Sequence, residues 1–481
     1  MAELLLQSLP YQRDSNDLIR RIGALPDAVC LDSGLGNQQT GRYDILTGLP
    51  SRQLRMRATS RRPVLEQRQD GQRSWQVMPA SSCIFAEAES LLQQDRPDSK
   101  TMAQLSQLPF CGGVIACFGY DAASPQATQH DSGALHDILM QVPVAVCGLY
   151  QWAIVVDHQS MTTSLFILPE CPDVIRQQVL QDVVPPLLHC TDAESDAAAR
   201  SSDFDLHRSF QAQLSRSQYE AAFDRLKSYI VAGDCYQANL AIPFVGAFSG
   251  DPLQAYLTLR QHSHSPFSAF MNTGDTQILS LSPERFVSVQ DRQVTTQPIK
   301  GTRKRSPDPV IDRQLSDELL ASEKDRAENL MIVDLLRNDL GTVCETGSVQ
   351  TRELFKLHSF SQVHHLISTI TGTLPLHVSP LALLKRCFPG GSITGAPKIR
   401  AMQIIAELEP LPRAVYCGSV AYCDYRGKMD SNICIRTLLC RQGHIFCWGG
   451  GGIVADSEVS REYQEAHDKV STLMDLVSAR P

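Results

Sequence analysis

An antiparallel β-hairpin is predicted by QILSLSPERFVSVQDRQVTTQPIKGTR, residues Gln277–Arg303. Two strand-forming runs, Phe286–Val289 and Val294–Gln297, flank the polar turn Gln290–Gln293. β-rich runs on either side of a short polar turn are typical of two paired antiparallel strands. The rest of the chain is interpreted outward from this strand pair.

The register of this hairpin would bring a carboxylate and an amine together. If the turn is centred near Asp291 or Arg292, then Glu284 lies opposite Lys300, and directly opposed residues have Cβ atoms roughly 5 Å apart. The pair could form a cross-strand salt bridge at the surface, which this segment alone favours. It could instead be a general acid beside a nucleophilic or basic amine.

Segments with helical periodicity surround the hairpin. In four of them apolar residues recur at helical spacing, and one stops at Gly233, which suits a helix C-terminus. Strand-like runs lie between them, which favours an α+β architecture over a regular alternation of parallel strands and helices. The segments are Ser217–Ala232, Asp312–Asn338 (one long helix or two short ones), Pro397–Leu408 and Ser457–Ala479.

Two of these helices carry acidic faces. Asp325 and Glu328 are three residues apart, and Glu462, Glu465 and Lys469 follow the same helical spacing. Carboxylates from two facing helices could hold Mg²⁺, which takes oxygen ligands and keeps several waters. Spacing alone favours the other interpretation, two solvated and salt-bridged helix faces.

A glycine-rich loop, FPGGSITGAPK at 388–398, precedes the third helix. Gly390 and Gly395 have P-loop spacing, but Ala-Pro follows where a nucleotide site needs Lys-Ser or Lys-Thr. A glycine-rich turn into a helix N-terminus suits a carboxylate. Lys398 could assist there or face solvent.

Single residues in apolar surroundings add candidates. Arg436 is predicted inside the strand Ile433–Leu439, where it needs an anionic partner because burying it unpaired is costly. Tyr416 precedes the strand-like run Cys417–Tyr422 and is by itself more typical of a core residue. The glycine run in Trp448–Val454 permits close backbone approach or forms a flexible turn.

Composition excludes several classes of protein. The 44 basic and 52 acidic residues give a net charge of −8, which argues against nucleic-acid binding. The 15 cysteines are scattered without a C-x-x-C pair, so neither a zinc ribbon nor a redox dithiol is indicated. The longest apolar stretch, Val142–Val156, is too short to span a bilayer, and no signal peptide is evident. We expect a cytoplasmic protein with no membrane or nucleic-acid partner.

A small, polar and acidic stretch, Thr191–Asp205, is the best candidate for a linker. It separates an N-terminal region, residues 1–195, from a region at 205–481 that carries the hairpin and the acidic helices. The two regions are expected to pack together as one intertwined unit.

The order of the segments resembles the chorismate-utilising enzymes, a family that includes anthranilate, aminodeoxychorismate, isochorismate and salicylate synthases. The resemblance covers roughly Ser217–Leu473, with weaker matches at FGYD (118–121) and WAIVVDH (152–158). The matching segments are SPERF (282–286), PIKGTR (298–303), DRAENLMIVDLLRNDLG (325–341), HHLIST (364–369), FPGGSITGAPK (388–398), YCGSVAY (416–422), CIRTLL (434–439) and GGGIVADSEVSREYQEAHDK (450–469).

This resemblance implies a four-layer α/β/β/α core with two orthogonally packed, mostly antiparallel sheets. It also implies chorismate as substrate and Mg²⁺ as cofactor. Glu328 and Glu465 would hold the metal, with Asp325 and Glu462 as outer or water-mediated partners. Glu284 would be the general acid that helps the C4 hydroxyl leave.

The resemblance also implies the residues that contact chorismate. Arg436, Tyr416 and Lys469 would bind its carboxylates, with Lys398 as a further candidate. Gly395 and Ala396 would present backbone donors. His365 would lie near the ring.

One residue separates the branches of the family. Anthranilate synthases resemble this stretch but read PIAGTR, whereas this chain has Lys300. An amine there can attack ring C2 and displace the C4 hydroxyl, and ammonia can then add at C4, a transaminase-type amination. Gln237 stands where the isochorismate and salicylate synthases have a water-activating lysine. The aminodeoxychorismate branch, on the route to 4-aminobenzoate and folate, is therefore favoured. The alternatives are anthranilate synthase component I and a catalytically silent regulatory homologue that binds tryptophan.

Two further partners are implied by the resemblance. The chain lacks a G-x-C-x-G nucleophile elbow, so a separate glutaminase subunit would supply ammonia. A family tryptophan pocket would be formed by Ser33, Thr40, Gly41, Arg42, Tyr43, Pro266, Phe267 and Ser268. This chain reads Thr-Gly-Arg-Tyr at 40–43 where the family has YSRF, so tryptophan binding stays open.

Overall fold

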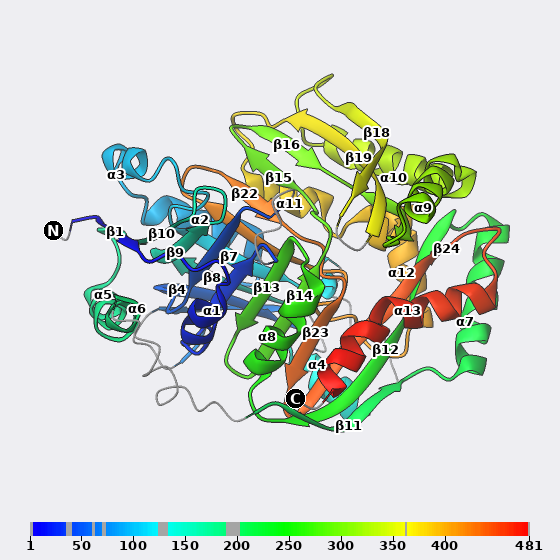
Figure 1. The fold of residues 1–481 in the computed structure, drawn as a ribbon, viewed down its shortest axis with the longest axis horizontal. Coiled ribbons are helices and arrows are strands. Elements are labelled where there is room, and N and C mark those ends of the chain that lie inside the picture. The colour runs from blue at the N-terminus through cyan, green and yellow to red at the C-terminus, as the bar shows by residue number, and fades with distance from the viewer. Residues whose placement is uncertain are drawn as a thin grey trace.

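Two large antiparallel sheets form the centre of the molecule (Figure 1). The computed structural model describes residues 3–34, 41–59, 63–69, 74–123, 133–188, 203–360 and 363–479. The first sheet runs in the order β1 (Leu5–Leu9), β10 (Thr162–Ile167), β9 (Trp152–Asp157), β3 (Tyr43–Thr47), β2 (Val29–Asp32), β13 (Phe267–Asn272), β14 (Thr276–Ser282), β23 (Thr437–Arg441), β24 (His444–Ile453), β12 (Gln237–Ser249) and β11 (Asp205–Ala212), with β20 (Gly395–Ala396) paired to β12.

The second sheet is assembled in the same antiparallel manner. Its order is β17 (Ile299–Lys304), β19 (Val363–Thr373), β16 (Gln293–Thr296), β15 (Ser288–Gln290), β22 (Met429–Ser431), β21 (Ser419–Asp424), β7 (Gly113–Phe118), β8 (Ala145–Tyr150), β4 (Arg52–Arg57), β5 (Val64–Gln69) and β6 (Gln76–Val77), with β18 (Gln350–Ser359) paired to β19.

Helices pack against each sheet. The first sheet contacts α1 (Asn16–Gly23), α7 (Arg216–Ala232), α8 (Pro252–Ser263), α12 (Lys398–Leu408) and α13 (Val459–Ser478). The second contacts α2 (Ile84–Gln94), α9 (Pro309–Ala321) and α10 (Glu323–Gly341), and α11 (Pro380–Cys387) lies on α2 and α10. Shorter helices are α3 (Ser99–Gln104), α4 (Ala134–Met140), α5 (Asp173–Gln178) and α6 (Val184–Leu188). The predicted α+β class is confirmed.

Strand alternation divides the core into layers. Along β13, Ala269 and Met271 belong to the apolar cluster shared by both sheets. Phe270, between them, belongs to the cluster that includes residues of α1, α7, α8 and α13. Successive side chains of a strand point to opposite faces, so the first sheet is buried on both sides. No helix within the described ranges is both long and apolar enough to cross a membrane.

Both sheets mix the two halves of the chain. In the first, β2 pairs with β13, and in the second, β7 pairs with β21. Gly113 makes the second pairing possible, because a Cβ there would lie 2.4 Å from the carbonyl oxygen of Cys423. The linker prediction at Thr191–Asp205 falls largely on residues outside the described ranges, with β11 beginning at its end.

Most of the predicted elements are confirmed. The segment after residue 308 forms two helices, α9 and α10, because the chain leaves the helical conformation at Ser322, whose side chain caps α10. Helix α7 ends at Gly233 with φ of 81°, a left-handed conformation that glycine adopts without steric cost. The prediction that Arg436 lies inside a strand was wrong, since β23 begins only at Thr437.

Candidate active site

The hairpin forms with a register one residue away from the predicted one. Ser288 pairs with Thr295 and Gln290 with Gln293, because Asp291 and Arg292 both adopt positive φ, 50° and 65°, as a two-residue type I′ turn requires. Glu284 therefore does not lie strictly opposite Lys300. Its carboxylate accepts a hydrogen bond from the backbone of the neighbouring Ile299.

Glu284 nevertheless shares an electrostatic environment with Lys300. The Glu284 side chain lies in the loop after β14 and is only 7% exposed. Burial raises its pKa to about 7, although the positive charges of Lys300 and Lys469 act in the opposite direction. A carboxyl group with this pKa is partly protonated at neutral pH, which a general acid requires.

β17 packs closely against α9 and the start of α10 at Gly301, the residue after Lys300. Gly301 has φ of 85°, and a Cβ there would lie 2.9 Å from Leu319 and 3.0 Å from the Cβ of Asp325. Only glycine allows this approach. Asp325 is further held by Arg303, at 3.3 Å.

The predicted acidic faces of α10 and α13 face the same region. Burial raises the pKa of Glu328, and the negative charges of Asp325 and Glu465 raise it further. Burial and the charge of Glu465 also raise the pKa of Glu462. Carboxylates from two helices, distant in sequence, thus repel one another across one site.

Lysines partly neutralise this cluster. Although burial opposes it, the ion pair with Lys469 at 2.6 Å lowers the pKa of Glu465. Lys324, which the sequence analysis did not identify, lies 3.9 Å from Glu328. Its charge also opposes the rise in the pKa of Glu462 and contributes to the lowered pKa of Glu465. Its position four residues before Glu328 was a usable signal.

The glycine run of β24 forms the surface under these carboxylates. It is a paired strand rather than a flexible turn. At Gly449 a Cβ would lie 2.0 Å from the carbonyl oxygen of Ala466 in α13. At Gly451 it would lie 3.1 Å from Glu462 and 3.5 Å from Glu465. The glycines thus let the strand approach both the backbone and the acidic face of the helix.

Arg436 has no partner of its own in the described part of the chain. It is largely buried, its φ is 51°, and no hydrogen bond or ion pair of its guanidinium is found there. Burial lowers the pKa of Arg436. A largely buried guanidinium without a partner among the described residues, held by a left-handed backbone, is suited to receive an anion.

His365 lies near this arginine on β19. Its pKa falls to about 4, mainly through burial and next through the charge of Arg436. The ring is therefore neutral at physiological pH. It hydrogen-bonds Thr302 at 2.8 Å, which couples it to the strand that carries Lys300.

Some predicted substrate ligands already have internal partners. Lys398 binds the carboxylate of Asp339 at 2.7 Å and the carbonyl oxygen of Cys387 at 2.9 Å, so its amine does not face solvent. Lys469 donates to the carbonyl oxygen of Gly450 at 2.9 Å in addition to its ion pair with Glu465. Tyr416 is 4% exposed and stacks on Trp448, with ring centroids 6.1 Å apart.

A buried ion pair behind the glycine-rich loop was not predicted. Gly395 and Ala396 form β20, which pairs with β12. Arg413 holds this region, because it pairs with Glu409 at 2.7 Å and donates to the carbonyl oxygen of Ile393 at 3.1 Å. The pair lies beyond the end of α12, so no helical spacing indicated it.

The residues predicted to bind tryptophan lie around one cavity of about 790 Å³. The cavity lies between strands of both sheets, away from the carboxylates of α10 and α13. Thr40 falls outside the described residues. The cavity is lined by the other seven, Ser33, Gly41, Arg42, Tyr43, Pro266, Phe267 and Ser268.

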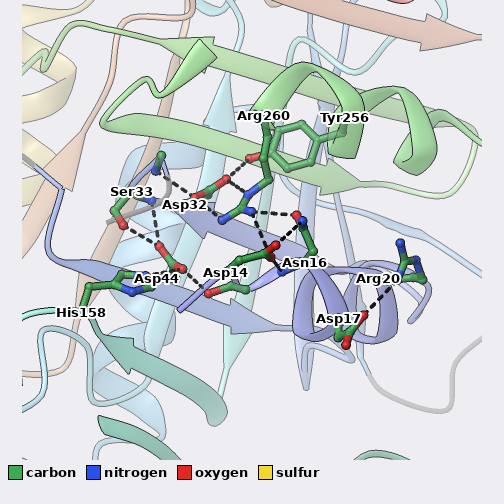
Figure 2. Close-up of polar contacts among 12 residues, drawn as sticks. Asp14, Asn16, Asp17, Arg20, Asp32, Ser33, Asp44, His158, Tyr256 and Arg260 are labelled. Carbon is green, nitrogen blue, oxygen red and sulfur yellow. Dashed lines mark hydrogen bonds and ion pairs between the residues drawn. The ribbon is translucent and has the colours of Figure 1, made fainter. Parts of the chain in front are cut away.

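A buried polar network supports one wall of this cavity (Figure 2). Arg260 of α8 pairs with Asp32 at 2.6 Å, and Tyr256 donates to the same carboxylate at 3.1 Å. Asp44 accepts from Ser33 at 2.7 Å and contacts His158 at 2.8 Å. The wall is thus positioned by hydrogen bonds that run behind Ser33.

Comparison with known proteins identifies the class. The sequence matches the family described as chorismate binding enzyme over residues 57–475, and this chain belongs to that family. It is 41% identical to aminodeoxychorismate synthase component 1 of Escherichia coli K12, over 97% of each chain. Anthranilate synthase component 1 of Bacillus subtilis is more distant, at 35% identity over 77% of this chain and 74% of that one.

A solved structure supports the same assignment. Anthranilate synthase component I from Streptococcus pneumoniae TIGR4 superposes with a TM-score of 0.73 at 30% identity, covering 90% of this chain and 92% of that one. The resemblance drawn from the sequence motifs is therefore confirmed at the level of family and fold.

Proposed function

We propose that this chain is the chorismate-aminating component of an aminodeoxychorismate synthase, which converts chorismate and ammonia to 4-amino-4-deoxychorismate. The supporting relatives are those that carry this name at about 40% identity over nearly the full length. The observation that carries the proposal is the joint placement of Glu284, with its raised pKa, and Lys300 beside it.

The residues suggest a two-stage reaction. The amine of Lys300 attacks ring C2, the ring double bonds shift toward C4, and the bond from C4 to its hydroxyl breaks. Glu284 donates the proton that lets the hydroxyl leave as water. Ammonia then attacks C4, and the bond between C2 and the Lys300 nitrogen breaks. The amine leaves with its electron pair, and the product carries nitrogen at C4.

Arg436 and His365 have complementary roles in this proposal. The unpaired guanidinium of Arg436 binds a carboxylate of chorismate, which takes the place of the partner that is missing among the described residues. His365, kept neutral by burial and by Arg436, lies beside the ring without adding a further charge.

The carboxylates of α10 and α13 fit Mg²⁺. Glu328, Glu462 and Glu465 offer the oxygen donors that Mg²⁺ prefers, and their mutual repulsion would be relieved by a cation. No group of three or more His, Cys, Asp or Glu side chains within metal-holding reach is found among the described residues. When bound, Mg²⁺ would screen a carboxylate of the doubly anionic substrate.

Two partners follow from the same proposal. The name component 1 in the relatives implies a second component, which we take to be a glutaminase subunit that supplies ammonia. We also take the 790 Å³ cavity to be the tryptophan pocket of the family. The enzyme would work in the cytoplasm.

The experiment that tests the proposal is adduct trapping without ammonia. Chorismate and Mg²⁺ should leave a covalent adduct on wild-type protein, because nothing resolves it. Intact mass should rise by chorismate minus one water, on the peptide that contains Lys300. Lys300→Ala should remove the adduct and most of the 4-amino product.

Lys324→Ala is the matched control, because it removes a nearby lysine of the same carboxylate cluster. It should keep the adduct. Product with nitrogen at C2 in the wild type would instead identify an anthranilate synthase. No product at all with chorismate, Mg²⁺ and ammonium would favour the silent homologue. Robust 4-amination without any adduct and without loss in Lys300→Ala would exclude covalent catalysis.

A further inference from the structure

A second cavity, of about 300 Å³, lies at the other end of β13 from the tryptophan pocket. Phe267 and Ala269 line the first cavity, whereas Met271 and Thr273 line the second. These four residues alternate along one face of the strand. The second cavity also takes residues from β4, β7 and β8, so strands of both sheets enclose it. It shares no lining residue with the first cavity or with the proposed active site.

Two of the three arginines that line this cavity are neutralised internally. Arg55 and Arg57 both bind the carboxylate of Glu66, each at 2.6 Å. Arg55 also stacks on Trp75, with its guanidinium carbon 4.1 Å from the ring centroid. These contacts build a rigid wall, with Trp75 as its aromatic part.

The third arginine, Arg441, is not satisfied. It is 7% exposed, and one of its terminal nitrogens donates to Thr276 at 2.7 Å. Its Nε is buried and has no hydrogen-bond partner. Asp275, the one carboxylate in ion-pair range among the described residues, is 3.9 Å away and 87% exposed, so solvent weakens the attraction.

A buried guanidinium without a close counterion is costly, and an anion that enters the cavity would remove that cost. The rest of the lining is mixed. Leu54, Val146 and Met271, with Trp75, form its apolar part, and polar residues such as Gln53 and Gln141 form the remainder. A site of this size with one unsatisfied cation and partly apolar walls accepts a small ligand with a single negative charge.

We propose that this cavity is a binding site for a small aromatic monocarboxylate. The carboxylate pairs with Arg441, and the ring packs among the apolar side chains beside Trp75. Binding at this position is distinct from tryptophan binding and from chorismate binding. The site is joined to the tryptophan pocket by β13 and β2, each of which contributes residues to both cavities.

Benzoate, with benzamide as its neutral counterpart, tests the proposal by titration calorimetry on the full chain. Benzoate should bind, and benzamide should bind at least about tenfold more weakly, because it lacks the charge that Arg441 requires. Arg441→Gln should weaken benzoate binding by a similar factor. Trp75 is the one tryptophan that lines this cavity, so benzoate should change the fluorescence of the wild type but not that of Trp75→Phe.

Asp275→Asn gives a test that does not depend on a buried substitution. Its side chain is exposed, so the fold should be unaffected, and loss of the competing carboxylate should tighten benzoate binding by about two- to fivefold. Arg436→Gln, which removes the unpaired cation of the active site, should leave benzoate binding unchanged.

The opposite pattern overturns the proposal. Benzoate binding that is lost in Arg436→Gln and kept in Arg441→Gln would place the ligand in the active site. Equal binding of benzoate and benzamide, no binding of either, or no change in Asp275→Asn would show that Arg441 does not receive an anion. If Arg441→Gln fails to fold, the Asp275→Asn and Arg436→Gln titrations decide.

Discussion

Two buried clusters of charge in this molecule differ in how their charges are satisfied. In the wall of the 790 Å³ cavity, Asp32 is paired with Arg260 at 2.6 Å, and Asp44 contacts His158 at 2.8 Å (Figure 2). Burial disfavours the charged form of His158, but the hydrogen bond and charge of Asp44 raise its pKa. Each charge in this wall has an opposite charge within contact.

In the active site, by contrast, buried charges are left without a close opposite charge. Glu284 is buried with a pKa of about 7, and burial raises the pKa of Glu328, to which the like charges of nearby carboxylates add. Arg436 has no partner within the described residues. Its burial disfavours its own charge.

The difference teaches how the two clusters are used. Paired and hydrogen-bonded buried charges hold a structure in one arrangement, whereas buried groups whose charges are unsatisfied are held ready for a ligand or a proton. Substitutions in the first kind of cluster should therefore lower the free energy of unfolding, and substitutions in the second kind should lower activity.

The largest expected effect is on turnover in Glu284→Gln. The substitution removes the proposed proton donor, so turnover should fall by about 10²–10⁴, with little change in chorismate affinity. Wild-type turnover should fall as pH rises through about 7, because the carboxyl loses its proton, and the variant should lack this decline. Steady-state kinetics between pH 6 and about 9 would measure both.

The same substitution should affect stability in the opposite direction from turnover. The pKa of Glu284 is higher in the folded protein than its ordinary 4.5. The fold therefore loses stability as pH rises from that value through about 7. At higher pH, Glu284→Gln should be as stable as the wild type or more stable, by on the order of 1–3 kcal/mol.

The kinetic prediction for Glu284 can also fail. If Glu284→Gln binds chorismate poorly yet turns over normally at saturation, Glu284 acts in binding and not in catalysis.

Asp32→Asn should show the converse behaviour. It leaves Arg260 buried without its close counterion, which costs roughly 3–5 kcal/mol of unfolding free energy. Denaturant unfolding would measure the loss, and turnover per folded molecule should change little. A stability loss in Glu284→Gln as large as that in Asp32→Asn would abolish the distinction between the two clusters.

Much of the fold could be predicted from local patterns. The hairpin and the helices follow from periodicity, caps and turn residues, such as Gly233 at the end of α7. The register was missed by one residue because the type I′ turn at Asp291 and Arg292 needs two residues with positive φ, and neither is glycine. Arg436 was misplaced for a similar reason, since its left-handed backbone has no sequence signal.

The site could be predicted only in part. The spacing of Glu328, Glu462 and Glu465 indicated two acidic faces, but not that they face one another. The pairing of Asp32 with Arg260 joins residues more than two hundred positions apart, and no local pattern shows it. Lys398 was expected at the substrate or in solvent, whereas its pairing with Asp339 depends on how α10 meets α12.

A smaller effect is expected from Glu465→Gln. The change removes one carboxylate from the cluster while the shape of α13 is kept. If Mg²⁺ binds there, the concentration for half-maximal activity should rise by at least about tenfold. Glu328→Gln should behave alike. Activity measured against Mg²⁺ concentration would show this, and unchanged dependence in both variants would refute the metal assignment.

The smallest effect is expected from Arg42→Ala, at the same cavity as Asp32 but at the surface. Arg42 binds Asp157 through two hydrogen bonds of 2.9 and 2.8 Å. This is geometry as good as that of Asp32 with Arg260, but the Arg42 side chain is 48% exposed. An exposed pair contributes about 0–1 kcal/mol, so unfolding free energy should fall by less than about 1 kcal/mol. Measuring the unfolding free energies of both variants in one denaturant series separates the effect of burial from the effect of hydrogen-bond geometry. If Arg42→Ala cost as much as Asp32→Asn, hydrogen-bond geometry rather than burial would set the energy of these pairs, and the contrast between the two clusters would lose its physical basis.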